Sequence, residues 1–174
     1  KQRMKIKGKL SGECVRLRSY EKEDLPFCMG IWLDEENGRY LSDPTANFVD
    51  VVYQKALDNL QDREDVYYLM VETKDGDRVG TCFAAPDEQG LGFDIGYCIE
   101  KHCWKQGYGT ETLHLLIDWI RKLGGKWVTA EVAIENLGSI ALLEKCGFVL
   151  EKESEFQKYN MDIRFPSRCY RLEL

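Results

Sequence analysis

The stretch Ile99–Thr110, with the sequence IEKHCWKQGYGT, connects a predicted strand to the longest predicted helix of the chain. Its glycines, Gly107 and Gly109, stand where that helix begins. A glycine there lets the main chain approach a ligand closely and adopt dihedral angles that other residues avoid. The first turn of a helix also presents free N–H groups and the positive end of the helix dipole. Strand, glycine loop and helix together predict a seat for a phosphate or pyrophosphate, although a turn that merely needs two glycines is the alternative.

The chain upstream of this loop predicts an antiparallel meander. Strands are expected over residues 66–73, 79–84 and 92–99, where β-branched and aromatic residues cluster between turn signals. The dipeptide Asp75-Gly76 between the first two strands is a strong hairpin signal, because both residues accept the dihedral angles of a tight turn.

Downstream of the loop the period of the apolar residues changes. Leu113, Leu116 and Ile120 lie on one face of a helix expected over 107–123, which Gly124 ends. The other expected elements are strands over 14–18, 128–134, 148–151 and 169–174 and helices over 21–33, 49–60 and 136–146. The predicted fold is α/β (α+β), a mixed, mainly antiparallel sheet of about six or seven strands flanked by about four helices, with a parallel step across the long helix.

Composition restricts the class of protein. The chain has 174 residues, of which 44% are hydrophobic and 31% charged, and this suits one domain with a buried core. The net charge of −6 argues against a nucleic-acid partner. No apolar run approaches the roughly 20 residues that a transmembrane helix needs, so no membrane partner is expected. Residues 1–9 are expected to lie outside the ordered fold, with Met4 as a candidate natural start after an added leader.

The cysteines predict neither a disulfide framework nor a metal site. They are seven in number and scattered, none has C-x-x-C spacing, and His102 and His114 are not placed to complete a zinc site. Free thiols in a reducing, cytoplasmic compartment are therefore expected. A nucleophilic role for Cys98 or Cys146 is disfavoured, because no histidine is placed in the sequence to activate either one.

Two common nucleotide-binding motifs are excluded by their spacing. The Walker pattern G-x-x-x-x-G-K-[S/T] is not matched by the residues that follow Gly107. The dinucleotide fingerprint needs a third glycine where Thr112 stands, and it belongs in an early βαβ unit rather than after a meander. A ligand other than a nucleoside triphosphate or NAD is therefore expected.

A second segment, Asn136–Phe148 with the sequence NLGSIALLEKCGF, completes a family pattern. Together with the loop from Trp104 to Gly109 it resembles the GCN5-related N-acetyltransferase (GNAT) superfamily, especially the branch that includes the ribosomal-protein alanine acetyltransferases. That superfamily holds the acetyl-CoA pyrophosphate on a Q/R-x-x-G-x-G/A loop that opens a helix. Trp104 replaces the leading Gln or Arg, and Lys105 stands where glycine is frequent. The resemblance covers about residues 10–174 and implies one GNAT-like acetyltransferase domain over 1–174.

The resemblance also implies how acetyl-CoA is bound. Lys105 would add a positive charge, and the pyrophosphate would lie on the main-chain amides of Gln106, Gly107, Tyr108, Gly109 and Thr110. Main chain near Cys98 and Ile99 would pair with the pantetheine arm and offer an N–H to the thioester oxygen. Asn136 would cap the helix that follows it and, with Ser139, contact the pantetheine arm.

The acid and base residues depart from the family pattern. Asp94 falls where histone acetyltransferases carry a glutamate base, and Glu131 is the reserve candidate. Many members protonate the leaving thiolate with a tyrosine at the position of Leu143, so that general acid is missing. Ser139 or Tyr97 is expected to substitute, unless the thiolate leaves unprotonated, since a thiol pKa is only about 8.5.

The function implied is acetyl-CoA-dependent transfer of an acetyl group to a primary amine by direct attack in a ternary complex. The partners are then acetyl-CoA as cosubstrate and an amine acceptor, either a protein N-terminus or a small molecule, with no metal. The alternative is a non-catalytic acyl-CoA-binding or sensor module on the same fold, prompted by Leu143 and Asp94 in place of the usual residues. The identity of the acceptor and the formation of a homodimer are left open.

Overall fold

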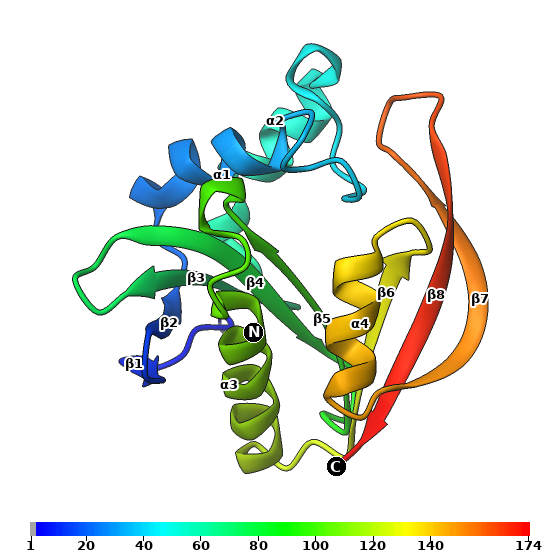
Figure 1. Ribbon diagram of the computed structural model, residues 1–174. Coiled ribbons are helices and arrows are strands. Elements are labelled where there is room, and N and C mark those ends of the chain that lie inside the picture. Colours follow the sequence, from blue (N-terminus) through cyan, green and yellow to red (C-terminus); the bar gives the residue numbers. More distant parts are fainter. Residues whose placement is uncertain (1–2) are drawn as a thin grey trace.

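The computed structural model describes residues 3–174 as one eight-stranded sheet with helices packed against both faces (Figure 1). The predicted α/β architecture is confirmed, with one strand more than the upper end of the prediction. The strands are β1 Lys9–Ser11, β2 Val15–Ser19, β3 Tyr67–Thr73, β4 Arg78–Pro86, β5 Gly92–Ile99, β6 Trp127–Ala133, β7 Val149–Gln157 and β8 Arg164–Glu173. The helices are α1 Leu25–Trp32, α2 Val51–Asp58, α3 Tyr108–Lys122 and α4 Leu137–Lys145, with 3-10 turns at Lys22–Asp24, Ala46–Phe48, Leu60–Asp62 and Lys101–Cys103.

Strand β1 is the element that the sequence analysis missed. Its three residues are too few to show alternation, and it is held by antiparallel pairing with β2, where Lys9 lies opposite Arg18. The chain before it is also attached, because Ile6 donates its N–H to Ser19 Oγ at 2.8 Å. Residues 1 and 2 of the segment expected outside the ordered fold lie outside the described residues.

The hairpin of β7 and β8 is longer than its sequence suggested. Nearly every residue of β7 is exposed, so no apolar alternation marks the strand beyond its first residues. Antiparallel pairing with β8 keeps β7 extended instead, and the paired residues continue to Gln157 opposite Arg164.

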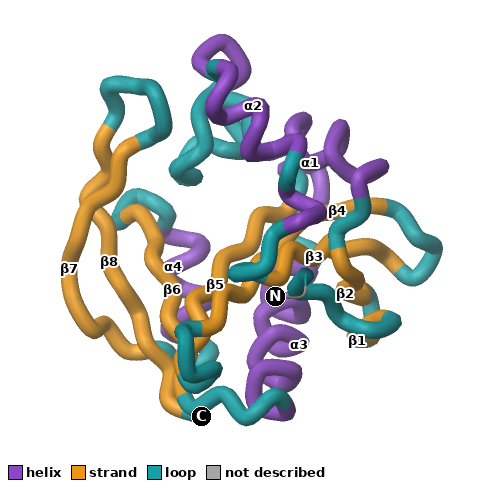
Figure 2. Tube along the Cα trace, turned by 180° about the vertical axis from the view of Figure 1, so that it is seen from behind, coloured by secondary structure: helices purple, strands orange, loops and turns teal. Residues whose placement is uncertain are grey.

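The sheet order, β1-β2-β3-β4-β5-β6-β8-β7, contains one parallel pair. Strands β1 to β5 form an antiparallel meander, and α3 carries the chain across to β6, which pairs parallel with β5 as predicted. Strand β8 then lies antiparallel beside β6. Figure 1 and Figure 2 both show β5 and β6 diverging toward the end of the sheet where α1 and α2 lie.

Two hydrophobic clusters hold the helices to the sheet. The larger one packs α3 and α4 against one face through side chains such as Leu113, Leu116 and Leu143. The smaller one packs α1 and α2 against the other face through Ile31 and Leu57. Each fully buried aliphatic side chain contributes roughly 1.5–3 kcal/mol, so these clusters fix the helices on opposite sides of the sheet.

Helix α3 is tied to the sheet at its first turn and ends as the sequence predicted. Glu111 Oε1 accepts the N–H groups of Cys14 and Val15, each at 2.8 Å, which pins the start of β2 to the start of the helix. Gly124 ends the helix with a φ of +92°, a left-handed conformation that glycine adopts without a steric penalty.

A buried charge network joins β1, β2 and β3. The basic groups that bind the carboxylate of Glu72 are Lys9 Nζ at 2.7 Å, Arg16 Nε at 2.8 Å and Arg18 Nε at 2.9 Å. Arg18 also binds Asp24, as does Arg78. Desolvation on burial opposes ionisation, but the hydrogen bonds from these cations prevail and lower the pKa of Glu72 from 4.5 to about 2.

This network predicts a pH-dependent stability. Because the folded pKa of Glu72 is depressed, its stabilisation is present above pH 4.5 and is lost as the pH falls from about 4.5 toward 2. Glu72→Gln should lower the free energy of unfolding at pH 7 by on the order of 3 kcal/mol, since it leaves guanidinium groups without their partner. Urea denaturation at pH 7 and pH 3 measures this, with Glu153→Gln on exposed β7 as the control. A loss of the same size at both pH values would contradict it.

Candidate active site

Strands β5 and β6 pair over only three residues. Gly92 to Asp94 lie opposite Trp127 to Thr129, and beyond that point β5 continues beside β4 alone. The second half of β5 therefore has a free side toward β6. A gap of this kind exposes main-chain hydrogen-bonding groups that a sheet normally satisfies.

The register of β4 and β5 shows which peptide groups face the gap. In an antiparallel ladder, pairs that exchange two hydrogen bonds alternate with pairs that exchange none. Glu100 donates its N–H to Val79 O at 2.8 Å, so the bonded pairs of β5 fall on its even-numbered residues. The peptide groups of Tyr97 and Ile99 consequently face the gap. Cys98 turns its peptide groups toward β4, and its thiol accepts a hydrogen bond from Asn37 Nδ2 at 3.4 Å.

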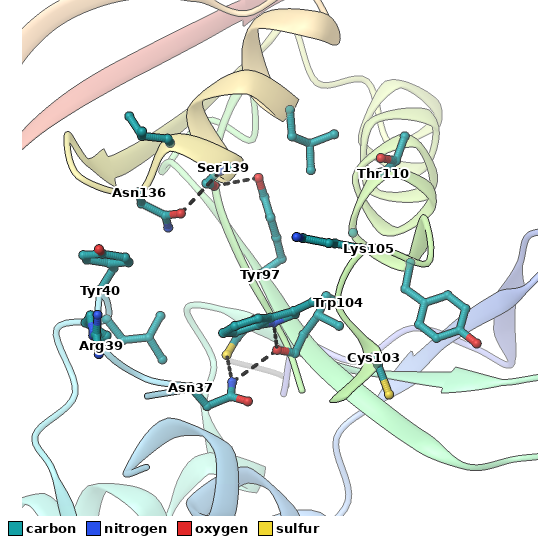
Figure 3. Close-up of a pocket in the computed structure, with 18 of the residues that line it drawn as sticks. Asn37, Arg39, Tyr40, Tyr97, Cys103, Trp104, Lys105, Thr110, Asn136 and Ser139 are labelled. Carbon is teal, nitrogen blue, oxygen red and sulfur yellow. Dashed lines mark hydrogen bonds between the residues drawn. The ribbon is translucent and has the colours of Figure 1, made fainter. Parts of the chain in front are cut away.

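A pocket of about 650 Å³ opens at this gap, between the loop before α3 and the start of α4 (Figure 3). Most of the cofactor-binding residues expected from the sequence line it: Cys98, Ile99, Lys105, Gly107, Tyr108, Gly109, Thr110, Asn136 and Ser139. Gln106 does not line it, because its side-chain amide turns back to donate to His102 O at 3.4 Å. The segment 36–41 closes the pocket from the opposite side, and no motif in the sequence had indicated it.

The loop before α3 has the backbone of an anion seat. Gly107 is the N-cap of the helix with a φ of +83° and offers no side-chain oxygen, so the first amides of α3 stay uncapped beside the pocket. Lys105 also adopts a left-handed φ of 63°, a conformation that favours glycine. A non-glycine residue there costs roughly 1–2 kcal/mol, so the loop retains a glycine-like conformation against a steric penalty.

Gly109 has a different reason to be glycine. A Cβ atom built on it would meet Leu142 at 3.6 Å and Ile99 at 3.9 Å, which are ordinary contacts. Gly109 lies in the first turn of α3 and has a negative φ, which other residues adopt equally well. Neither the fold nor the backbone therefore requires glycine here, and close approach of a ligand is the remaining reason.

The carbonyl oxygen of Ile99 is already engaged. It accepts Trp104 Nε1–H at 2.7 Å and Asn37 Nδ2–H at 3.2 Å, as the dashed lines of Figure 3 show. Asn37 Oδ1 in turn accepts the N–H of Lys101 at 2.6 Å. Of the gap-facing groups of Ile99, the N–H is thus the one left for a pantetheine arm or a thioester oxygen.

The start of α4 brings two predicted residues together. Tyr97 Oη and Ser139 Oγ lie 2.8 Å apart in the pocket (Figure 3). Asn136 caps the helix, as predicted, by accepting the N–H of Ser139 at 3.4 Å. Leu143, the position at which the resemblance led us to expect a tyrosine, is buried in the core.

Asp94 lies on the other side of the sheet from Tyr97. Side chains alternate along a strand, so residues three apart point to opposite faces. Asp94 lines a second pocket of about 500 Å³ together with Glu131, and it accepts a hydrogen bond from Thr129 Oγ1 at 2.9 Å. Desolvation by the pocket walls raises the pKa of Asp94, with a further contribution from the negative charge of Glu131.

The two pockets meet at the gap. Six residues line both of them: Tyr40, Leu41, Tyr97, Cys98, Asn136 and Ser139. An anion seat at α3 and a carboxylate-bearing pocket beneath α1 thus adjoin at the gap between β5 and β6. This is the geometry that two substrates need if they react with each other directly.

Comparison with known families decides the family. The acetyltransferase (GNAT) domain model matches residues 15–149. The chain belongs to the GNAT acetyltransferase family. A related sequence, described as an uncharacterized N-acetyltransferase, p20 of Bacillus licheniformis, is 29% identical over 157 residues, which cover 84% of each chain.

Solved GNAT structures share the whole fold. The spermidine N-acetyltransferase from Vibrio cholerae, in complex with CoA and spermine, matches with a TM-score of 0.76 at 17% identity, covering 91% of this chain and 95% of that one. The acetyltransferase from Salmonella typhimurium that modifies the N-terminal serine of ribosomal protein L7/L12 matches with a TM-score of 0.77 at 15% identity, covering 96% and 99%. At these identities the likeness shows the fold.

One buried lysine of this GNAT domain anchors the segment that walls both pockets. Lys158, between β7 and β8, is only 4% exposed, and its Nζ donates to the carbonyl oxygens of Gly38 and Leu41 at 2.9 Å and of Asp43 at 2.8 Å. Desolvation lowers the pKa of Lys158. Tyr159 adds an N–H bond to Ser42 O at 2.8 Å. A lysine in a polar stretch carries no sequence signal for such a role.

A cysteine–histidine contact corrects one expectation from the sequence. Cys146 Sγ lies 3.5 Å from His114 Nε2, which reaches it from α3 across a sequence separation of 32 residues. A histidine is therefore beside this thiol after all. Burial nevertheless raises the pKa of Cys146, and Cys146 lines neither pocket. A nucleophilic cysteine needs the opposite shift.

Two features are absent from residues 3–174, the described part of this GNAT domain. None of its described helices has the length and apolar character needed to cross a bilayer. Within the same residues, no three histidine, cysteine or acidic side chains come together as metal ligands.

The anchoring by Lys158 predicts a local effect. Lys158→Met removes three charge-assisted hydrogen bonds, each worth about 1.5–3 kcal/mol, and should loosen residues 38–43. Hydrogen–deuterium exchange should show faster exchange in that segment, with unchanged protection in α3. Lys152→Met, on exposed β7, is the matched control. Unchanged exchange over residues 38–43 would refute the anchoring role.

Proposed function

We propose that this GNAT domain transfers the acetyl group of acetyl-CoA to a primary amine by direct attack in a ternary complex. The meeting of the two pockets at Tyr97, Cys98 and Ser139 carries this proposal, because a thioester in one and an amine in the other would come together there. The Vibrio cholerae relative, solved with CoA and spermine, supports an acetyl-CoA cosubstrate and an amine acceptor.

The pocket beside α3 is the proposed acetyl-CoA site. The uncapped amides at the start of the helix would bind pyrophosphate oxygens, favoured by the helix dipole. Lys105 lines this pocket and would add a positive charge. Leu137 and Leu142, which also line it, offer an apolar wall to the pantetheine arm.

The chemistry requires a base on one face and an acid on the other. Asp94 would take a proton from the ammonium, and the free amine would then attack the thioester carbon. A gap-facing N–H, that of Ile99, would donate to the oxyanion of the tetrahedral intermediate. When the carbon–sulfur bond breaks, the hydrogen-bonded pair of Tyr97 and Ser139 would give a proton to the thiolate, and the extra proton on the former amine nitrogen would pass to this pair and restore it.

The shifts in pKa suit these roles. Desolvation raises the pKa of Asp94, which makes the carboxylate a stronger base. Desolvation also raises the pKa of Tyr97, which keeps its hydroxyl protonated at neutral pH, while the hydrogen bond with Ser139 opposes this rise. The base is on the side of the second pocket and the acid on the side of the first, as transfer from amine to thiolate demands.

Gly109→Ala tests the pyrophosphate seat. The added methyl group makes only ordinary contacts with the protein, so the melting temperature should be unchanged or slightly raised, while the affinity for acetyl-CoA falls by about tenfold or more. Titration calorimetry with acetyl-CoA measures the affinity. Gly30→Ala in α1, where a Cβ would meet no atom within 4 Å, should leave the affinity unchanged. Equal affinity in the Gly109 variant would sink the assigned seat.

Asp94→Asn tests the base. We expect kcat to fall by roughly 10²–10⁴-fold, because general-base catalysis contributes that much, while acetyl-CoA affinity is retained. The acidic limb of the profile of kcat/KM against pH should also disappear, and Asp94→Glu should restore part of the rate. A profile with the same acidic limb in the Asn variant would remove Asp94 from this role.

The same assays separate the enzyme from a sensor. A screen of peptides, polyamines and aminoglycosides with acetyl-CoA should find at least one acetylated amine. Binding of CoA with no transfer to any of them would instead favour a non-catalytic acyl-CoA sensor, the alternative that Leu143 and Asp94 in place of the usual residues prompted.

A further inference from the structure

The second pocket, called the acceptor pocket from here on, is lined by acidic side chains and by no basic side chain. Asp43, Asp94 and Glu131 line it, whereas none of its lining residues is a lysine or an arginine. Each carboxylate has a hydroxyl group as its side-chain partner: Tyr53 for Asp43, Thr129 for Asp94 and Ser167 for Glu131. Within residues 3–174, none of the three takes part in an ion pair, in contrast to Asp24 and Glu72.

The nearest buried cation does not neutralise this pocket. The ammonium of Lys158 is directed at three main-chain carbonyls rather than at the carboxylate of Asp43. Although Tyr53 and Lys158 both favour ionisation, desolvation prevails and raises the pKa of Asp43. A carboxylate in this condition gains when a ligand brings a positive charge.

Aromatic rings form the rest of the wall. The acceptor pocket is lined by the aromatic side chains of Trp32, Tyr40, Tyr68, Phe83 and Phe156. The ring centroid of Tyr68 lies 6.2 Å from that of Trp32 and 6.2 Å from that of Phe83. An ammonium over such rings is attracted by their negative faces, and a methylene chain packs against them. Rings and carboxylates together favour a ligand with an ammonium group on a methylene chain. The pocket volume of about 500 Å³ fits a small molecule.

We propose that the acceptor is a small dicationic amine, whose second positive charge is held by Asp43 among the aromatic rings while the reacting amine lies at the gap near Tyr97. This inference rests on the proposed acetyl transfer and names its substrate class. An amine that carries a carboxylate is disfavoured, because its negative charge would enter a pocket with three carboxylates and no cation on its wall.

Three amines that differ only at the far end of the chain test it. In 1,5-diaminopentane, 1-hexylamine and 6-aminohexanoate, five methylenes separate the reacting amine from an ammonium, a methyl or a carboxylate group. With saturating acetyl-CoA, kcat/KM for the diamine should exceed that for hexylamine by about tenfold and that for aminohexanoate by about a hundredfold. Equal values, or a preference for either of the other two amines, would overturn the inference.

A substitution locates the second charge. Asp43→Asn keeps a group that can accept the hydrogen bond of Tyr53 but removes the charge, so it should shrink the preference for the diamine over hexylamine to about twofold. Asp75→Asn, in the β3–β4 turn, is the matched control and should keep the full preference. A preference that survives in Asp43→Asn would refute the assignment of Asp43.

Failure of the inference is distinguishable from failure of the proposed function. If no amine is acetylated, calorimetry in the presence of CoA still compares the diamine with hexylamine. Tighter binding of the diamine, lost in Asp43→Asn, would support a dication site without transfer. Equal or absent binding of both amines would overturn it.

Discussion

The whole site depends on the early end of one parallel strand pair. Strands β5 and β6 share only three paired positions, from Gly92 opposite Trp127 to Asp94 opposite Thr129. Beyond them, β5 remains paired with β4, so its free peptide groups stay ordered although no strand on the other side binds them. Helix α3 begins just past the end of β5 and α4 just past the end of β6, and both helix N-termini therefore face the same gap.

The segment between α1 and α2 forms part of the wall of both pockets at this gap. Asn37 attaches the segment to the end of β5, and Lys158 attaches it to the loop between β7 and β8. Elements from the beginning, the middle and the end of the chain thus meet over the gap. Because these elements pack on opposite faces of the sheet, the pocket lined by Asp43, Asp94 and Glu131 is separated from the anion seat. Tyr97 and Cys98 line both pockets.

Local signals in the sequence predicted most of the frame, and long-range contacts account for what was missed. Gly107 and Asn136 mark helix starts through backbone chemistry that acts within a few residues, so their positions were predictable. Asp94 and Tyr97 could be placed on opposite faces by strand alternation alone. Asn37 and Lys158 could not be found this way, because each acts on partners 40 or more residues away in the sequence. Asp43 could not be found either, because its role depends on the pocket wall to which it belongs. His114 beside Cys146 was missed for the same reason.

The way in which Lys158 holds its neighbours leaves their side chains free to change. Its ammonium binds the main-chain oxygens of residues 38, 41 and 43, and every amino acid carries such an oxygen. Substitution at Arg39, Tyr40 or Leu41 therefore alters the wall presented to a substrate without removing the anchor. A fixed backbone with variable side chains is the arrangement found in binding loops on a rigid scaffold. Under the proposed function, side-chain changes in this short segment would alter the acceptor preference while its main-chain anchor to Lys158 stays the same.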